Sequence, residues 1–240
     1  MSPSPFRPIG PAHYAPTQKD LELNNRPGLR VGVFFATREG HTKHVGEHIA
    51  ASLRAHGFDV DVLDVRRPLP FSLDNYAGAI LAASVHSGNH EPEMVKFVKR
   101  HRSELERIAT AFLSVTLSEA GAERIEASPS EHAQFVRDVN QMLDRFFQQT
   151  KWHPTRVKPV AGALLYTRYN FLLRLIMKSI ARKAGSGTDT SRDYDFTDWA
   201  RLDHFIADFE ESIRSMAASK TQTGSAKGPI PGSSVAANAD

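Results

Sequence analysis

Short apolar runs alternate with amphipathic segments through the middle of the chain. The runs have the unbroken or alternating apolar pattern typical of strands, and they lie at 30–36, 58–64, 76–84, 109–116 and 156–165. Segments with apolar residues at helical spacing lie between or after them, at 42–56, 92–105, 130–149 and 198–216. Strands separated by helices predict an α/β fold, with a five-stranded parallel sheet and helices on both faces.

The two ends of the chain lack this pattern. Residues 1–27 contain six prolines and no periodic apolar face, which predicts a disordered Pro-rich arm. Residues 218–240 are rich in Ser, Gly and Ala, which predicts a disordered tail. The predicted folded domain is therefore 28–217.

One segment, 166–187, interrupts the alternation before the closing helix. Its leucines and isoleucines share a helical pattern with Arg174, Lys178 and Arg182, which recur every fourth residue, and Arg168 precedes them. We predict a long amphipathic insertion after or within the fifth strand. Such a helix packs on its own domain or on a second subunit, or it lies at a membrane surface with its basic residues at lipid phosphates. The pattern leaves these alternatives open.

Composition excludes several kinds of site. The 240 residues include no cysteine, so disulfides, thiolate metal sites and iron–sulfur clusters are excluded and any redox chemistry needs a bound cofactor. The histidines show no spacing typical of a metal site, and no metal is expected. The formal net charge is only +3, and no nucleic-acid motif accompanies it, so nucleic-acid binding is not expected.

Hydropathy and the N-terminal segment indicate where the protein is located. No uninterrupted apolar stretch of about 18 residues exists, which excludes a polytopic membrane protein. The N-terminal segment has no apolar signal region, and the simplest expectation is a cytoplasmic protein.

The loop at 37–42 joins the first strand to a helix. A helix N-terminus exposes unpaired N–H groups and favours an anion, Thr37 and Thr42 can add hydroxyl donors, and Gly40 allows close approach of a ligand. The loop matches neither the dinucleotide nor the ATPase glycine pattern. It resembles the flavodoxin phosphate loop, which holds the FMN 5′-phosphate, although a polar turn without a ligand gives the same sequence. A carboxylate repels a phosphate, so we expect Glu39 to point into solvent.

Two further loops should meet the first, because ligands of doubly wound sheets bind beyond the carboxyl ends of the strands. Both are small and polar, as a flat flavin ring requires. The three loops together predict FMN binding by Thr37, Arg38, Glu39, Gly40, His41, Thr42, Ser84, Val85, His86, Ser87, Gly88, Ser114, Val115, Thr116 and Leu117.

Several motifs in register resemble one family over about 29–210. They include Thr37-Arg-Glu-Gly-His-Thr42, Ala111-Phe-Leu-Ser-Val-Thr-Leu117, Trp152-His-Pro-Thr-Arg156 and Thr197-Asp-Trp199. The family is the menaquinone-dependent protoporphyrinogen IX dehydrogenase (oxidase) family, a branch of the flavodoxin-like fold. His86-Ser87 stands where that family has Arg-Tyr, and His41 replaces a common glutamine.

The resemblance implies an oxidoreductase of haem biosynthesis. FMN would oxidise protoporphyrinogen IX to protoporphyrin IX and pass the electrons to a membrane quinone, either menaquinone or ubiquinone. It also implies peripheral association with the inner face of the cell membrane through Arg168, Arg174, Lys178 and Arg182. His86 and His90 are candidates for a catalytic base, because a neutral imidazole can accept a proton near pH 7. The alternative is that both are polar loop histidines without a catalytic role.

Other functions fit the same fold. A flavodoxin-type electron carrier is usually acidic, whereas the pI of this sequence is about 9.2. An NAD(P)H:quinone reductase and a regulatory protein without catalytic activity remain alternatives. Whether the chain forms a homo-oligomer, which quinone it uses and what its two arms do are not fixed by the sequence.

Overall fold

The computed structural model describes residues 29–67, 72–123, 127–168 and 189–225. The predicted Pro-rich arm, most of the insertion and the end of the tail lie outside these ranges. Arg174, Lys178 and Arg182, on which the membrane prediction rests, are therefore outside the described residues.

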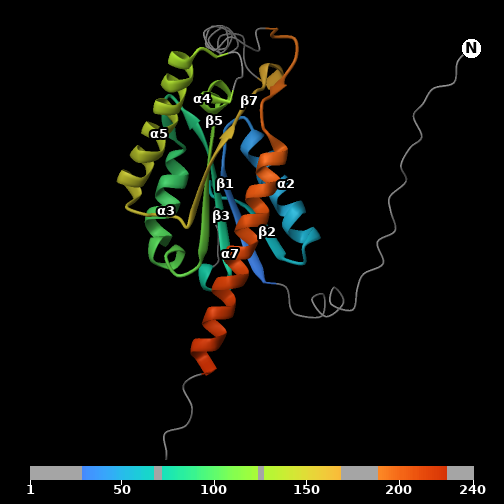
Figure 1. The fold of residues 1–240 in the computed structure, drawn as a ribbon, viewed down its shortest axis with the longest axis vertical. Helices are drawn as coiled ribbons and strands as arrows, with labels where there is room; N and C mark the ends of the chain where they lie inside the picture. Colours follow the sequence, from blue (N-terminus) through green and yellow to red (C-terminus); the bar gives the residue numbers. More distant parts are fainter. Residues whose placement is uncertain (1–28, 68–71, 124–126, 169–188, 226–240) are drawn as a thin grey trace, which may run out of the picture.

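A five-stranded parallel sheet forms the centre of the molecule, as the sequence predicts (Figure 1). The strands lie in the order β2-β1-β3-β5-β6. Their bounds are β1 (Arg30–Ala36), β2 (Asp59–Asp64), β3 (Gly78–His86), β5 (Ala109–Thr116) and β6 (Arg156–Ala161). The chain leaves β1 toward β2 and then crosses to the other side at β3. This reversal opens a crevice at the carboxyl ends of β1 and β3, the position where such sheets bind ligands.

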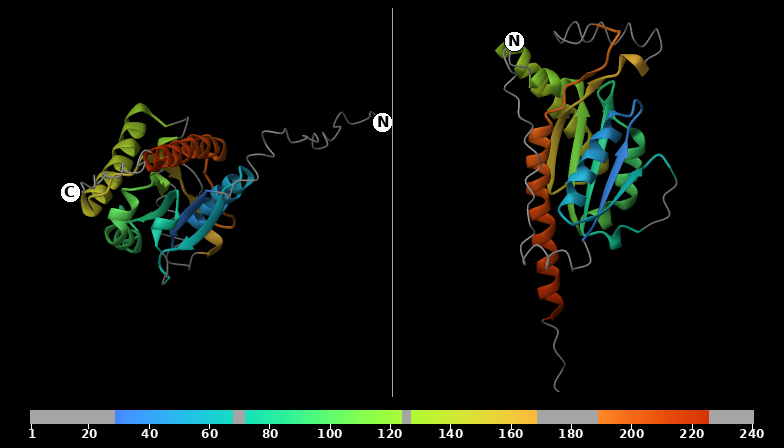
Figure 2. Two further views of the ribbon diagram at one scale, coloured as in Figure 1. Left: turned by 90° about the horizontal axis from the view of Figure 1, so that it is seen from below. Right: turned by 90° about the vertical axis from the view of Figure 1, so that its right-hand side faces the viewer.

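Helices cover both faces of the sheet (Figure 2). Their bounds are α2 (His41–Ala55), α3 (Pro92–Leu105), α4 (Leu117–Ala122), α5 (Pro129–Thr150) and α7 (Trp199–Ser225), with short 3₁₀ turns η1 (Leu73–Asn75) and η2 (Tyr166–Arg168). The α2 and α7 helices pack on one face and α3 and α5 on the other.

Each strand residue points to the face opposite that of its neighbour, which explains the two cores. On β1, Val33 and Phe35 pack under α2 and α7, while Phe34 and Ala36 pack under α3 and α5. Because these strands are buried on both sides, their sequences are apolar throughout rather than alternating. Each fully buried Phe or Val side chain contributes about 1.5–3 kcal/mol relative to exposure.

The prediction of one continuous fifth strand over 156–165 is wrong. The parallel strand β6 ends at Ala161, and β7 (Ala163–Leu164) pairs antiparallel with β8 (Tyr194–Asp195) in a separate small sheet. The break falls at Gly162, whose N–H donates to the Thr116 carbonyl at 3.0 Å. The chain therefore turns over the end of the sheet and reaches the crevice.

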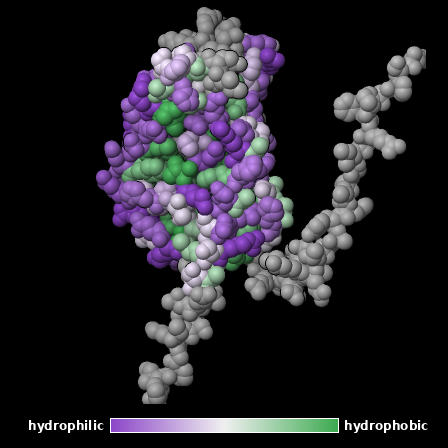
Figure 3. All heavy atoms as spheres, viewed as in Figure 1, coloured by the Kyte–Doolittle hydropathy of each residue, from purple (hydrophilic) through white to green (hydrophobic). Residues whose placement is uncertain are grey.

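Strand β6 is an edge of the sheet. Figure 3 shows patches of apolar surface on the face of the molecule that it draws. The large apolar side chains exposed among the described residues are Val136 of α5 and Val157 of β6. Pro159 lies within the edge strand and has no N–H to offer to a further strand.

The predicted loop after the third strand is a tight hairpin. Strand β3 continues to His86, and β4 (Asn89–His90) pairs with it antiparallel. The two connecting residues have positive φ, 50° at Ser87 and 73° at Gly88, as a two-residue hairpin turn requires. The hairpin places His86 and Ser87 at the carboxyl edge of the sheet.

Two other boundaries differ from the prediction. The closing helix was expected to end at Met216, but α7 extends to Ser225, into the predicted tail, and projects beyond the sheet in Figure 1. The segment after the fourth strand was expected to be a loop, but α4 starts at Leu117. The Ser118 N–H donates to the Thr116 hydroxyl at 3.2 Å, which caps this helix.

Candidate functional site

A cavity of about 420 Å³ lies at the carboxyl edge of the sheet. All three predicted loops contribute to it, and its size is within the range of ligand pockets. The predicted residues that line it are Thr37, Glu39, His41, Thr42, Ser84, Val85, His86, Ser87, Gly88, Val115, Thr116 and Leu117.

Four further residues of the lining are absent from the prediction: Ser118, Met142, Gly162 and Ala163. Ser118 lies in the polar segment after the fourth strand, but the predicted cofactor-binding residues end at Leu117. The sequence from Thr116 to Glu119 has a helix-capping pattern that identifies α4. Met142 lies in the helix expected at 130–149, and no local signal brings Met142, Gly162 or Ala163 to the site.

Several predicted residues lie elsewhere. Arg38 and Gly40 line a second cavity of about 530 Å³ on the other side of the 37–42 loop. Ser114 is fully buried and hydrogen-bonds to His90 over 2.9 Å. Arg168 lies in η2, but its side chain is outside the described residues.

The backbone of the 37–42 loop is shaped for an anion. Gly40 has a φ of 98°, and its N–H donates to the Thr37 hydroxyl at 3.1 Å, so the chain turns sharply into α2. The Thr42 hydroxyl is buried and has no hydrogen-bond partner among the described residues. Because buried hydroxyl groups are normally paired, this one is suited to an oxygen of a bound ligand. Thr42 lines the first cavity and not the second, which favours the first as the ligand site.

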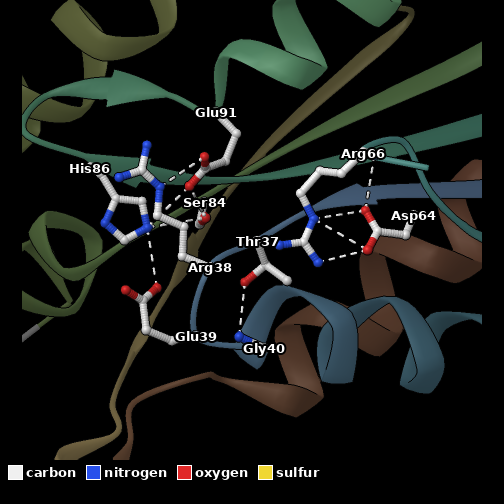
Figure 4. Close-up of polar contacts among 9 residues, drawn as sticks. All are labelled: Thr37, Arg38, Glu39, Gly40, Asp64, Arg66, Ser84, His86 and Glu91. Atoms are coloured by element: carbon white, nitrogen blue, oxygen red, sulfur yellow. Dashed lines mark hydrogen bonds and ion pairs between the residues drawn. The ribbon is translucent and has the colours of Figure 1, made fainter. Parts of the chain in front are cut away.

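Four charged side chains form a row of contacts that begins at the cavity with Glu39 and His86 and continues away from it through Glu91 and Arg38 (Figure 4). The His86 Nε2 atom lies 3.1 Å from both Glu39 Oε2 and Glu91 Oε1. Arg38 Nε donates to Glu91 Oε2 at 3.1 Å, and the Ser84 hydroxyl donates to Glu91 Oε1 at 3.0 Å. The expectation that Glu39 points into solvent is therefore wrong, because its carboxylate turns toward His86 and is only 25% exposed.

These contacts set the charge of His86. Hydrogen bonds to Glu39 and then Glu91 raise the pKa of His86 to about 9, against the effect of burial. For Glu91, burial raises the pKa, but the hydrogen bonds from His86, Ser84 and Arg38 together hold it below its usual value. These contacts favour the imidazolium, which has no free nitrogen lone pair to accept a proton; a catalytic role of His86 stays a prediction.

The second candidate base is removed from the cavity. His90 is 6% exposed and packs against Phe112 and Phe146, with ring centroids 5.2 and 5.0 Å away. Burial lowers the pKa of His90 to about 4, so the ring is neutral. Its hydrogen bond to Ser114 ties β4 to β5, which is a structural role.

His41 is placed by Thr197, which the sequence analysis named only as part of a family motif and not as a residue of the site. Its Nε2 atom lies 2.9 Å from the Thr197 hydroxyl, which donates to the Ala161 carbonyl at 2.9 Å. Burial lowers the pKa of His41, despite the nearby Asp195. This contact connects the start of α2 to the segment that precedes α7.

The chain is similar to known proteins in its sequence and in its fold. The family described as "Flavodoxin domain" matches residues 32–191. Protoporphyrinogen IX dehydrogenase [quinone] of Escherichia coli K12 is 30% identical over 177 residues, which cover 74% of this chain and 92% of that protein. The protein of the same name from Leishmania major is 32% identical over 178 residues, 74% of this chain and 73% of that protein.

This chain belongs to the protoporphyrinogen IX dehydrogenase [quinone] family, within the flavodoxin-domain proteins. The resemblance inferred from its motifs is therefore confirmed. Membership in a flavodoxin-domain family indicates a flavin cofactor.

Solved structures of similar fold include flavodoxin 1 from Bacillus cereus, with a TM-score of 0.40 and 16% identity over 76% of this chain and 97% of that one. A flavodoxin mutant of Fusobacterium nucleatum bound to flavin mononucleotide gives a TM-score of 0.35 and 14% identity, over 78% of this chain and 95% of that one.

The charge of His86 predicts a pH dependence of stability. Its pKa is raised on folding, so the stabilisation is complete below the unfolded value near 6.5 and is lost as the pH rises through about 9. We expect His86→Ala to lower the free energy of unfolding by about 1–3 kcal/mol at pH 6, after allowance for partial exposure, and by much less at pH 10.

Urea denaturation at pH 6, 8 and 10 measures this difference. The exposed His204 on α7, whose Nδ1 atom bonds only its own helix at the Ala200 carbonyl, provides the matched variant His204→Ala. If His86→Ala lowers the free energy of unfolding by the same amount at all three pH values, the assignment of a charged imidazolium is contradicted.

Proposed function

We propose that this protein binds FMN in the 420 Å³ cavity and oxidises protoporphyrinogen IX to protoporphyrin IX, with a membrane quinone as electron acceptor. The observation that carries the proposal is the meeting of the 37–42, 84–88 and 115–118 segments around an unpaired, buried Thr42 hydroxyl at the switch point of the sheet. The names of the E. coli and L. major relatives support the substrate and the acceptor.

The residues present fit this cofactor. Thr42, the N–H groups at the start of α2 and the Thr37 hydroxyl would hold the phosphate. Val85, Leu117 and Met142 would provide apolar contact for the ring, and thioethers pack favourably against aromatic systems. Bound FMN would supply the two-electron chemistry, since no side chain of this cysteine-free protein can do so. The protein would orient the reactants and fix the local charge.

Replacement of Thr42 distinguishes an effect on cofactor binding from an effect on folding. Thr42→Val removes a hydroxyl that has no partner in the described structure, so we expect the stability of the free protein to be unchanged or higher. A hydrogen bond to a charged phosphate contributes about 1.5–3 kcal/mol, so FMN should bind roughly ten- to a hundredfold more weakly.

Quenching of flavin fluorescence measures the affinity, and urea denaturation measures the stability. Thr150→Val is the matched control, because Thr150 is buried in α5 away from the cavity and donates to the Phe146 carbonyl. Unchanged FMN affinity in Thr42→Val would place the phosphate elsewhere.

The reaction is tested with the FMN-loaded protein under anaerobic conditions. We expect protoporphyrinogen IX to bleach the flavin absorbance near ~450 nm, and added menaquinone or ubiquinone analogue to restore it with formation of protoporphyrin IX. Bleaching by NAD(P)H instead would favour a nicotinamide-linked quinone reductase. Reduction only by another redox protein would favour an electron carrier.

We infer that the protein associates peripherally with the inner face of the cell membrane, where its quinone would be found. The support is the basic, apolar sequence at 168–182. Within the ranges described, none of the helices has both the length and the hydropathy needed to cross a bilayer.

Sedimentation with anionic vesicles tests this association. Binding should weaken with salt, and replacement of Arg174, Lys178 and Arg182 by Gln should abolish most of it. The control variant replaces Lys96, Lys99 and Arg100, which are exposed on α3, and so removes the same charge from another surface. Equal loss in both variants would show attraction by overall charge and contradict a specific membrane face.

A further inference from the structure

A carboxylate stands inside the loop that would hold the flavin phosphate. Glu39 is adjacent to Gly40 and within three residues of both Thr37 and Thr42, and its side chain borders both cavities that flank the loop. Two like charges repel strongly in such a partly buried site. An acidic residue here would weaken phosphate binding unless its charge is neutralised and turned aside.

The hairpin between β3 and β4 supplies the opposite charge. His86 is the last residue of β3, and its Nε2 atom lies 3.1 Å from the Glu39 carboxylate (Figure 4). The turn that follows is fixed from outside, because Arg145 of α5 donates to the Gly88 carbonyl at 2.8 Å and to Asn89 Oδ1 at 3.2 Å. The position of His86 is therefore set by the fold before any ligand binds.

We infer that His86 is a positioning residue that holds the Glu39 carboxylate away from the flavin phosphate and cancels its charge, so that a phosphate loop containing a carboxylate can bind FMN. This inference rests on the proposed function, because it requires FMN in the 420 Å³ cavity. It concerns the phosphate end of the ligand and makes no use of His86 in proton transfer.

The contacts of Glu91 explain why we expect His86 to influence FMN binding through Glu39 and not through Glu91. Glu91 also faces His86 at 3.1 Å, but its side chain is 2% exposed and is held independently by Arg38 and by Ser84. Glu91 thus keeps a cationic partner when His86 is removed. Arg38, Glu91, His86 and Glu39 alternate in sign along this row of contacts, so loss of the imidazolium removes the cation that lies between Glu91 and Glu39.

The expected charge state agrees with this geometry. The two carboxylates raise the pKa of His86 to about 9, so the cation is present throughout the neutral range. A guanidinium at the same position would carry the same charge. An amide at position 39 carries no charge, so a cation at position 86 would then not be needed.

A double-mutant cycle with two flavins tests the inference. The variants are His86→Ala, Glu39→Gln and the double variant, with His86→Arg to restore the charge. Binding of FMN and of riboflavin, which has the same ring but no phosphate, is followed by fluorescence quenching at pH 7, and urea denaturation verifies that each variant is folded.

We expect His86→Ala to weaken FMN binding at least tenfold and riboflavin binding less than threefold. In the Glu39→Gln background the same substitution should change FMN affinity less than threefold, and His86→Arg should retain most of the original affinity. This pattern would not arise from a merely structural role of His86, which would affect both flavins.

Two results would overturn the inference while leaving the proposed function intact. One is an equal loss of FMN and riboflavin affinity in His86→Ala, and the other is a loss that persists undiminished when Glu39 is replaced by Gln. Failure of the unaltered, folded protein to bind FMN at all would overturn the proposed function and this inference together.

Discussion

The parallel register of three strands determines the site. Ala36 of β1 lies opposite Ala83 of β3, and Ala83 lies opposite Ser114 of β5, so one row of small residues crosses the centre of the sheet. Strand β1 ends at this row, and β3 and β5 end a few residues beyond it, at His86 and Thr116, so the loops that follow all start near the carboxyl edge. The crevice between them exists because the chain reverses its direction of winding between β2 and β3. A shift of one register step would move a whole strand's side chains to the opposite face and destroy both cores.

The elements outside the sheet complete the crevice rather than create it. The hairpin of β3 and β4 depends on two residues with positive φ, and its tip is held by Arg145 from α5. The end of β6 bends at Gly162, which brings Gly162 and Ala163 into the lining. These contacts join the cavity to the core beneath it, so its polar groups are arranged before a ligand arrives. Pre-arranged dipoles and charges bind a fixed anion without a further cost of reorganisation.

Charge within the cavity is balanced by pairs rather than supplied by one strong cation. The 37–42 loop contains Arg38, but its guanidinium is hydrogen-bonded to Glu91, whereas the buried Thr42 hydroxyl, which lines the cavity, has no hydrogen-bond partner among the described residues. Such a site can hold an anion through hydroxyl and backbone N–H groups at a helix N-terminus. It is also sensitive to any carboxylate nearby, which gives the contact between Glu39 and His86 its importance.

The sequence alone determined the sheet, its covering helices and the place of the 37–42 loop between β1 and α2, because buried parallel strands and amphipathic helices have distinct apolar periods. It also determined the family, through motifs such as Thr37 to Thr42 and Ala111 to Leu117. It could not determine that Glu39 turns inward, that His90 leaves the cavity or that Gly162 enters it. Glu91 is 53 residues from Arg38 in the chain, yet their side chains are in contact. Side-chain direction and protonation depend on neighbours that only folding brings together, and for that reason the tertiary structure decided the charges of the site.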